Sequence, residues 1–265
     1  MTARLATDEL REFAELPALS LSWDDDDTTV RYLSDRVCVI VWPTLAVVTA
    51  MKAAEGEVPG LLDEVRSLIP AGVHTDWYIG PSARPTGIVD DLQALGLREP
   101  RIGGTLHALL LDHEPTDDLS DIETHEVISM SDHVEAAEVR WDAFEVPHGR
   151  REHERGFLAT SYDDYLRTKD TSSISFVATV DRRVAGTASA LLSDRGLFLI
   201  GGSTAPWARG RGVYRALVAA RWQYAVARGT PALTVHAIHD SSSPILRRLG
   251  FEEVCTLRRL EDGPT

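Results

Sequence analysis

The order of strand-like and helix-like segments in residues 122–261 is the feature that most constrains the fold. Segments with alternating apolar residues, such as ETHEVISM at 123–130, predict strands because successive side chains of a strand point to opposite faces. The run 212–229 instead carries apolar residues at helical spacing and ends at Gly229, shortly before Pro231. Together the segments predict an α+β fold in which helices cover a largely antiparallel sheet. The expected strands are 123–130, 173–180, 184–193, 196–205, 232–238 and 253–261, with a hairpin turn at 181–183, and the expected helices are 132–144 (capped by Ser131 and Asp132), 150–168, 212–229 and 243–251.

The first half of the chain repeats part of this pattern. From the predicted strand end at Met51 to Gly96 there are 45 residues, and from the strand end at Thr204 to Gly250 there are 46. These glycines lie in the similar stretches LQALGLRE and LRRLGFEE. Two matched landmarks at near-equal spacing favour an internal duplication. The corresponding elements are predicted as strands at 44–51, 75–80 and 104–112 and helices at 60–69 and 85–97.

The boundary between the halves is predicted in the stretch DHEPTDDLSDIE, residues 112–123. It is acidic, contains a proline and has little to bury, which is typical of a solvated linker. We therefore predict two domains, 1–116 and 117–265, each a mostly antiparallel mixed sheet flanked by helices. The four aspartates at 24–27 favour a solvated turn, because consecutive side chains diverge and no further ligands follow at loop spacing. No metal site is predicted.

Composition narrows the possible partners and the compartment. The formal charge of −14 argues against nucleic acid and favours cationic or amine-bearing partners. Cys38 and Cys255 are the only cysteines and lie far apart, so a disulfide framework is not expected and a reducing compartment is. The N-terminus lacks the apolar core of a signal peptide, and no apolar run reaches membrane-spanning length. We predict a cytoplasmic protein that does not bind membranes, and its oligomeric state stays open.

The stretch APWARGRGVYR, residues 205–215, places two arginines and two glycines at the start of the predicted helix. A helix N-terminus has unpaired backbone amides and partial positive charge, which together suit an anion. Glycines allow close approach and positive φ, and arginine side chains suit phosphate. The alternative is a sharp turn whose arginines face water. The candidate diphosphate-binding residues are Arg209, Gly210, Arg211, Gly212, Val213 and Tyr214.

Arg209-x-x-Gly212, preceded by Pro206, resembles the acyl-CoA-binding motif of the GNAT N-acetyltransferase superfamily, usually Gln/Arg-x-x-Gly-x-Gly/Ala. The segment SPILRRLGF at 243–251 is similar to the family's second signature, and the element order of the second half is similar to the family fold. The resemblance implies that acetyl-CoA or another acyl-CoA binds as cosubstrate. The first half looks like a degenerate copy. Its loop AAEGEVPG at 53–60 lacks Arg-x-x-Gly, so no diphosphate is expected there.

The sequence departs from the family pattern at three positions. Tyr214 stands where glycine or alanine is usual, Leu246 where many members have a tyrosine acid, and His239 where asparagine is frequent. These departures leave the coenzyme prediction in place but weaken any catalytic assignment taken from the family.

The implied reaction is direct acyl transfer to an amine of a small molecule or peptide. Backbone donors near Ser203 and Thr204 are candidates for stabilising the oxyanion. His236 and His239 are candidate bases, each with a structural alternative, and Glu145 is a candidate for binding the amine. Tyr214 or a serine of DSSSP (240–244) is a candidate acid, whereas no pattern marks either cysteine as activated.

Three functions are compatible with these patterns. The first is an N-acetyltransferase that moves an acetyl group from acetyl-CoA to an amine. The second is a non-catalytic CoA-binding sensor or partner module, to which Leu246 lends support. The third is a transferase that takes its acyl group from aminoacyl-tRNA, but the acidic charge and the intact Arg-x-x-Gly loop argue against it.

Overall fold

The computed structural model describes residues 7–22, 29–115 and 122–263. The four aspartates at 24–27 and most of the predicted linker lie outside the described residues. The chain divides into two compact units, which we call unit 1 and unit 2. Among the described residues, unit 1 contains 21–22, 111–115 and 122–235, and unit 2 contains 7–20, 29–110 and 236–263.

The units are not continuous in sequence, because the C-terminal segment from His236 groups with the first half of the chain. The predicted boundary between residues 116 and 117 divides the chain into two copies of one fold, whereas the two units are defined by how residues pack together. It therefore stays a prediction.

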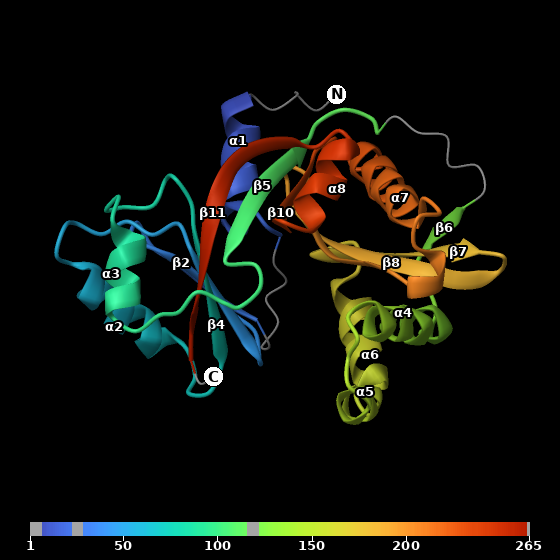
Figure 1. Ribbon diagram of the computed structural model, residues 1–265, viewed down its shortest axis with the longest axis horizontal. Coiled ribbons are helices and arrows are strands. Elements are labelled where there is room, and N and C mark those ends of the chain that lie inside the picture. The colour runs from blue at the N-terminus through green and yellow to red at the C-terminus, as the bar shows by residue number, and fades with distance from the viewer. Residues whose placement is uncertain (1–6, 23–28, 116–121, 264–265) are drawn as a thin grey trace. The chain divides into compact units, whose positions relative to one another are not determined.

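Unit 1 is built on strands that pair in the order β6-β7-β8-β9-β10. The pairs are antiparallel except β9 with β10, which is parallel. Helix α7 packs against one face of these strands and α4 against the other (Figure 1). The elements are β6 (Glu123–Glu126), α4 (Met130–Ala143), α5 (His148–Arg155), α6 (Leu158–Thr168), β7 (Ser173–Val180), β8 (Arg183–Leu192), β9 (Leu197–Thr204), the 3-10 helix η2 (Pro206–Ala208), α7 (Val213–Ala227) and β10 (Leu233–Ile238).

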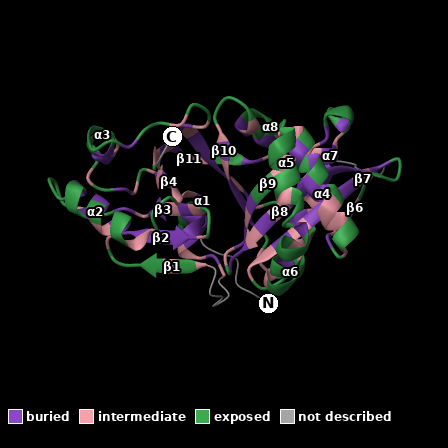
Figure 2. Cartoon of the chain, turned by 90° about the horizontal axis from the view of Figure 1, so that it is seen from below, coloured by how far each residue is buried: buried purple, intermediate pink, exposed green. Residues whose placement is uncertain are grey.

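Unit 2 includes the end of β10, from His236 onward, and contains the remaining strands in the order β1-β2-β3-β4-β11-β5. Among the described strand pairs of β1, β2, β3, β4, β5 and β11, β3 and β4 are parallel and the others are antiparallel. Helices α2 and α3 pack on a core around the fully buried Trp77, and strand β2 is buried along its whole length (Figure 2). The elements are α1 (Thr7–Glu15), the 3-10 helix η1 (Pro17–Leu19), β1 (Val30–Leu33), β2 (Cys38–Val41), β3 (Leu45–Thr49), α2 (Val58–Leu68), β4 (His74–Ile79), α3 (Ile88–Ala94), β5 (Thr105–Leu111), α8 (Ser242–Arg248) and β11 (Glu252–Asp262).

The structure confirms the predicted α+β class, with a mostly antiparallel sheet flanked by helices. Two local predictions were wrong. The helix expected at 150–168 is two helices, because the chain breaks at Gly156, a residue of low helix propensity. The helix expected from residue 132 begins at Met130 and is capped by Ser129, so β6 ends at Glu126, four residues earlier than predicted.

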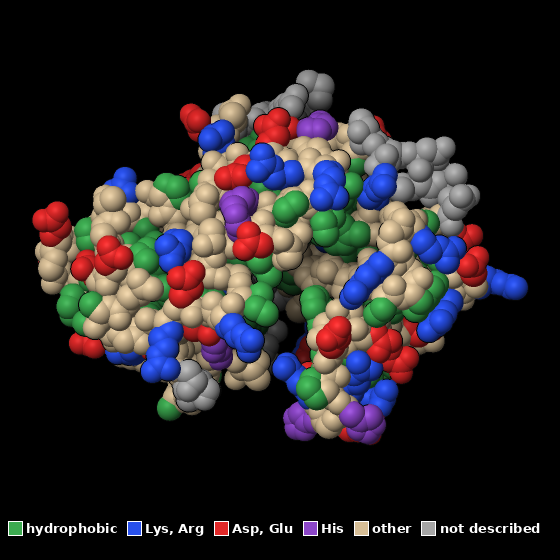
Figure 3. Space-filling model, viewed as in Figure 1, with side chains coloured by type: hydrophobic (Ala, Val, Ile, Leu, Met, Phe, Trp, Pro, Cys, Tyr) green, Lys and Arg blue, Asp and Glu red, His purple; other side chains and the backbone are tan. Residues whose placement is uncertain are grey.

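The strands β1 and β2 had no counterpart in the sequence prediction. On the face drawn in Figure 3, acidic and basic side chains of the described residues are interspersed, with hydrophobic side chains between them. Over the described ranges, every helix is too short or too polar to cross a lipid bilayer.

Candidate functional site

Strand β9 ends in an irregular stretch that leads to the β9–α7 loop, residues 205–212. Gly201 has φ of +62°, and the pairing with β8 shifts register between Thr187 and Ser189. A Cβ at Gly202 would lie 2.6 Å from the ring of Tyr214, so glycine is needed for this close packing. The Gly-Gly stretch therefore contains a β-bulge, and the space beside Gly202 is filled by Tyr214.

The loop then presents backbone amides at the start of α7. Gly212 is the N-cap residue, with φ of +87° and no side-chain cap, and the bond from the Ala216 amide to Gly212 O is 3.1 Å long. The amides of Val213 and Tyr214 precede this bond and have no acceptor among the described residues. Gly210 also has positive φ, and a Cβ there would meet no atom within 4 Å. The local geometry thus suits an anion at the N-terminus of α7.

The arginine side chains of the loop are exposed and only loosely held. Arg209 Nη2 donates to Ala143 O at 3.2 Å, and Arg211 Nη2 lies 3.2 Å from a carboxylate oxygen of Asp181. The Asp181 side chain is 80% exposed, so this ion pair contributes little and can be exchanged for a stronger anion. Arg183 stacks 4.6 Å from the ring centre of Trp207, which adds a further cation beside the loop.

Ser203 and Thr204 lie beyond the end of the parallel pairing between β9 and β10. That pairing contains two residue pairs, which involve only Leu197 and Phe198 of β9. Ser203 is buried, and its hydroxyl has no hydrogen-bond partner among the described residues. An unpartnered buried hydroxyl at an unpaired strand edge suits contact with a bound ligand.

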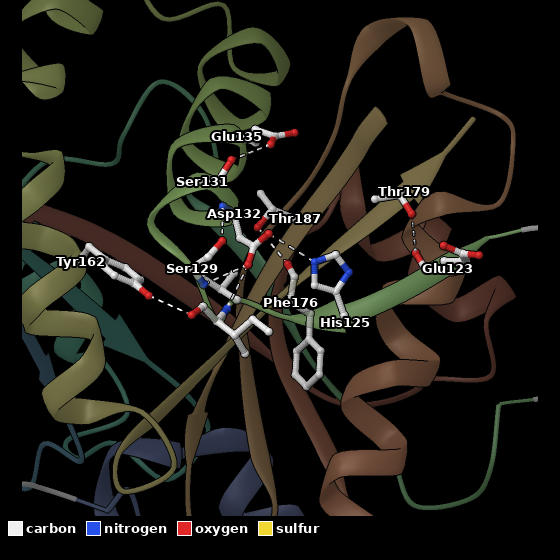
Figure 4. A network of polar contacts seen from close by, with 12 residues as sticks. Glu123, His125, Ser129, Ser131, Asp132, Glu135, Tyr162, Phe176, Thr179 and Thr187 are labelled. Atoms are coloured by element: carbon white, nitrogen blue, oxygen red, sulfur yellow. Dashed lines mark hydrogen bonds and ion pairs between the residues drawn. The ribbon is translucent and has the colours of Figure 1, made fainter. Parts of the chain in front are cut away.

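Glu145 lies at the C-terminal end of α4, exposed and with φ of +52°. Arg209 contacts the same end of this helix through Ala143. The other end is fixed by a capping box, in which the Ser129 hydroxyl accepts from the Asp132 amide and the Asp132 carboxylate accepts from the Ser129 amide (Figure 4). Glu145 thus follows the C-cap residue Phe144, at the end of α4 opposite the capping box.

The Asp132 carboxylate also contacts His125, whose ring points toward this cap (Figure 4). Nε2 of His125 lies 3.3 Å from Oδ1 of Asp132. Burial by itself raises the pKa of Asp132. Hydrogen bonds from Ser129, the Ile128 amide and His125 outweigh that effect, so the pKa lies below its ordinary value. Asp132 is thus a structural carboxylate of α4.

His236 lies in unit 2, at the fourth position of β10. Its Nε2 atom is 3.0 Å from Ala14 O, and its ring is 5.6 Å from that of Tyr78. Burial lowers the pKa of His236 to about 4, which keeps the ring neutral near pH 7. These contacts favour a structural role, and the predicted role as a base stays a prediction.

His239 also lies in unit 2 and belongs to a chain of polar side chains. Its Nδ1 is 2.7 Å from Nε2 of His107, and Nδ1 of His107 is 2.8 Å from the hydroxyl of Ser243. His107 and Ser243 are buried, whereas about half of the His239 side chain is exposed. Ser243 is one of the serines singled out in DSSSP. His107 was missed, and its only signal was a histidine among the apolar residues of β5.

Leu246 is buried in α8. Neither cysteine offers an alternative nucleophile. Burial raises the pKa of both thiols, to about 12 for Cys255, so both stay protonated near neutral pH.

The described residues include one group of three potential metal ligands in unit 2, formed by His74, Asp76 and Glu261. Arg259 Nη2 lies 2.9 Å from both carboxylates. Because a guanidinium already neutralises these acids, the group forms an ion-pair network and carries no metal assignment.

Comparison with known proteins finds a family match that covers the β9–α7 loop. Residues 134–251 match the model of the acetyltransferase (GNAT) family, and this segment contains the whole loop and α7. This segment is a GNAT-family domain. No curated protein sequence matches the chain.

Several solved structures resemble nearly the whole chain. A GCN5-related N-acetyltransferase from Kribbella flavida has 17% identity and a TM-score of 0.67, with 98% of each chain covered. A tandem GNAT protein from the clavulanic acid biosynthesis pathway has 14% identity and a TM-score of 0.59, with 99% of this chain and 98% of that chain covered. A functionally unknown conserved protein from Staphylococcus epidermidis has 12% identity and a TM-score of 0.63, with 91% and 97% covered. At these identities the likeness concerns the fold.

Proposed function

We propose that the chain is an N-acyltransferase that moves an acetyl group from acetyl-CoA to an amine of a small molecule or peptide by direct transfer. The observation that carries the proposal is the glycine-capped N-terminus of α7, whose first amides have no acceptor among the described residues. Membership of the segment in the GNAT family supports acyl transfer as the general activity.

In this proposal the chain's own residues bind and orient the cosubstrate. The amides of Val213 and Tyr214 hold the diphosphate, and Gly210 and Gly212 let it approach the backbone. Arg209 and Arg211 add charge, the latter by exchanging its weak ion pair with Asp181 for the phosphate. When bound, acetyl-CoA supplies an acetyl group activated as a thioester.

The chemical step needs an oxyanion donor, a proton acceptor and a site for the amine. Ser203 and Thr204 are the candidate donors, and loss of one such donor costs roughly 3–4 kcal/mol in other enzymes. The amine nitrogen would form its bond to the carbonyl carbon, and the carbon–sulfur bond would break so that CoA leaves as a thiolate. One proton leaves the ammonium group before the attack, and a second leaves the same nitrogen as the amide forms. His239 and, with less support from its contacts, His236 are the candidate acceptors, and Glu145 is the candidate amine ligand.

We also propose that residues 1–116 are a degenerate GNAT-like copy without a coenzyme loop and that the protein acts in the cytoplasm. Both cysteines are free, which suits a reducing compartment. One observation favours a second function, a non-catalytic CoA-binding module. The buried Leu246 offers no proton to a departing thiolate.

Release of free CoA tests the proposal and separates it from the alternative. The full chain is incubated with acetyl-CoA and a panel of amines, with an amine-free reaction as the control for hydrolysis. We expect thiol release above the control together with an acetylated amine detected by mass spectrometry. Tight CoA binding by calorimetry without turnover on any amine would establish the module instead, and absence of CoA binding would refute both.

A further inference from the structure

Unit 2 contains a pocket of about 710 Å³ that the proposed reaction does not use. All of its lining residues belong to unit 2, and they come from α1, η1, the β1–β2 connection, the ends of β3 and β4, and β11. Its volume is within the range of small-molecule sites, roughly 300–1,000 Å³.

The pocket opens where β3 and β4 separate. Their parallel pairing ends at Val48 with Trp77, and the two segments meet again only at Lys52 with Arg84. Between these points, Ala50 lines the pocket from one side with φ of +54°, and Ser82 lines it from the other. A positive φ at a non-glycine residue is a strained conformation that is more frequent at ligand sites.

One carboxylate in the pocket is held in a fixed position. Glu15 Oε1 accepts a hydrogen bond of 2.7 Å from the Ser82 amide, and its Oε2 atom has no hydrogen bond with a described residue. Gly80 makes room for this arrangement, since a Cβ there would lie 2.4 Å from Glu15 Oε1. A fixed carboxylate with one open oxygen suits an ammonium group.

Two cations line the same pocket. The side-chain cations of Arg11 and Lys52 form no hydrogen bond or ion pair with another described residue. Both Arg11 and Glu15 act electrostatically on Cys255, which lines the pocket, so opposite charges converge on one wall. Glu12 and Asp35 are exposed carboxylates that also contribute to the lining. Apolar side chains also line the pocket, among them Leu16, Leu19, Leu33 and Val254.

We propose that this pocket binds a zwitterionic, amino-acid-like molecule with an apolar body, such as a short peptide of apolar residues. Glu15 receives the ammonium group, Arg11 and Lys52 receive the carboxylate, and the leucine-rich wall receives the side chains. A purely anionic or purely cationic ligand would leave one set of charges without a partner. The proposal does not depend on acyl transfer, because no residue of the β9–α7 loop takes part.

Calorimetry of the full chain with leucyl-leucine, without coenzyme, tests the proposal. N-acetyl-leucyl-leucine lacks the ammonium group, and leucyl-leucine amide lacks the carboxylate. We expect the free dipeptide to bind at least about tenfold more tightly than either blocked form, since each loses one charge-assisted interaction. Absence of binding by the dipeptide, or equal binding of all three, overturns the proposal on the wild-type protein alone.

Variants assign the two ends of the ligand. Glu15→Gln should remove the preference for leucyl-leucine over its N-acetyl form, and Lys52→Ala with Arg11→Ala should remove the preference over the amide. Arg101→Ala is the matched control, because Arg101 is an exposed arginine of unit 2 outside the pocket lining. Gly212→Asp should bind the dipeptide like the wild type, which separates failure of this site from failure of the coenzyme loop. Wild-type preferences in all pocket variants would contradict the assignment.

Discussion

The loops that precede α2 and α7 differ in charge and in their cap residues, although the strands and helices around them follow the same order. Each follows a strand that pairs in parallel with the strand after the helix. Each half also has a glycine in the left-handed region after its next helix, Gly96 with φ of +104° and Gly250 with +95°. The shared framework supports the proposed duplication, and the loops decide what each copy can bind.

The loop before α2 places a carboxylate and a proline at the start of the helix. Glu57 is the N-cap residue, its carboxylate accepts a long bond from the Ala54 amide at 3.4 Å, and Pro59 removes one amide from the first turn. The loop before α7 has glycine at the cap and arginines in place of glutamates. The same backbone framework therefore repels an anion in one half and suits one in the other.

The largest expected effect comes from Gly212→Asp. The carboxylate of an aspartate at the N-cap would accept hydrogen bonds from the free amides of α7 and would repel the diphosphate. The substitution would also strain the backbone, because Gly212 has φ of +87°. We expect CoA affinity, measured by calorimetry, to fall on the order of 100-fold, about 2.7 kcal/mol.

Gly56→Asp is the matched control for this loop comparison. Gly56 has φ of +81° and open space around it, so the backbone strain is similar, but the loop before α2 holds no diphosphate in our proposal. Its CoA affinity should equal that of the wild type. Unchanged affinity of Gly212→Asp would refute the loop assignment, and equal losses in both variants would refute the distinction between the loops.

The fourth residues of β4 and β10 give a second comparison, between the buried Trp77 and the titratable His236. The pKa of His236 is lowered to about 4 in the folded protein, against about 6.5 when unfolded. As the pH falls below 6.5 the unfolded state takes up the proton first, so stability is lost between pH 6.5 and 4.

We expect His236→Gln to remove about 2 kcal/mol of this acid destabilisation, allowing for some access of solvent to the ring. The measurement is urea unfolding across this pH range. His113→Gln is the control, since His113 is an exposed histidine. If the free energy of unfolding of His236→Gln and of the wild type changed equally with pH, the prediction would be wrong. His236 would then make β10 no more sensitive to acid than Trp77 makes β4.

The coenzyme loop and the helices around it were predictable because their signals are local. Glycine and arginine at a strand–helix junction, and apolar residues at helical spacing, lie within about twenty residues of one another. The start of α4 was misplaced because two candidate caps overlap, and the Ser129-x-x-Asp132 spacing decides in favour of the earlier one.

The remaining site residues were not predictable because their contacts join distant parts of the chain. His107 contacts His239 across 132 positions, and the unit 2 pocket collects residues from both ends of the sequence. Strand β2 was missed because CVIV is buried on both faces and shows no alternation.

The smallest expected effects concern two glycines that contact or form the helices compared above. A Cβ at Gly186 would lie 2.4 Å from a methyl group of Val213 and 3.1 Å from the backbone oxygen of Ser203, so Gly186→Ala should destabilise the protein by roughly 1 kcal/mol. Gly60 lies in α2 with no atom within 4 Å of such a Cβ, so Gly60→Ala should stabilise by about 0.5 kcal/mol. Urea unfolding at pH 7 measures both changes.

Opposite signs of the two changes in unfolding free energy would show that α7 lies so close to its sheet that even one methyl group does not fit, whereas α2 has room at its exposed first turn. A neutral Gly186→Ala would instead show that Val213, and with it the start of α7, can shift without loss, which would weaken the argument for a rigid diphosphate site.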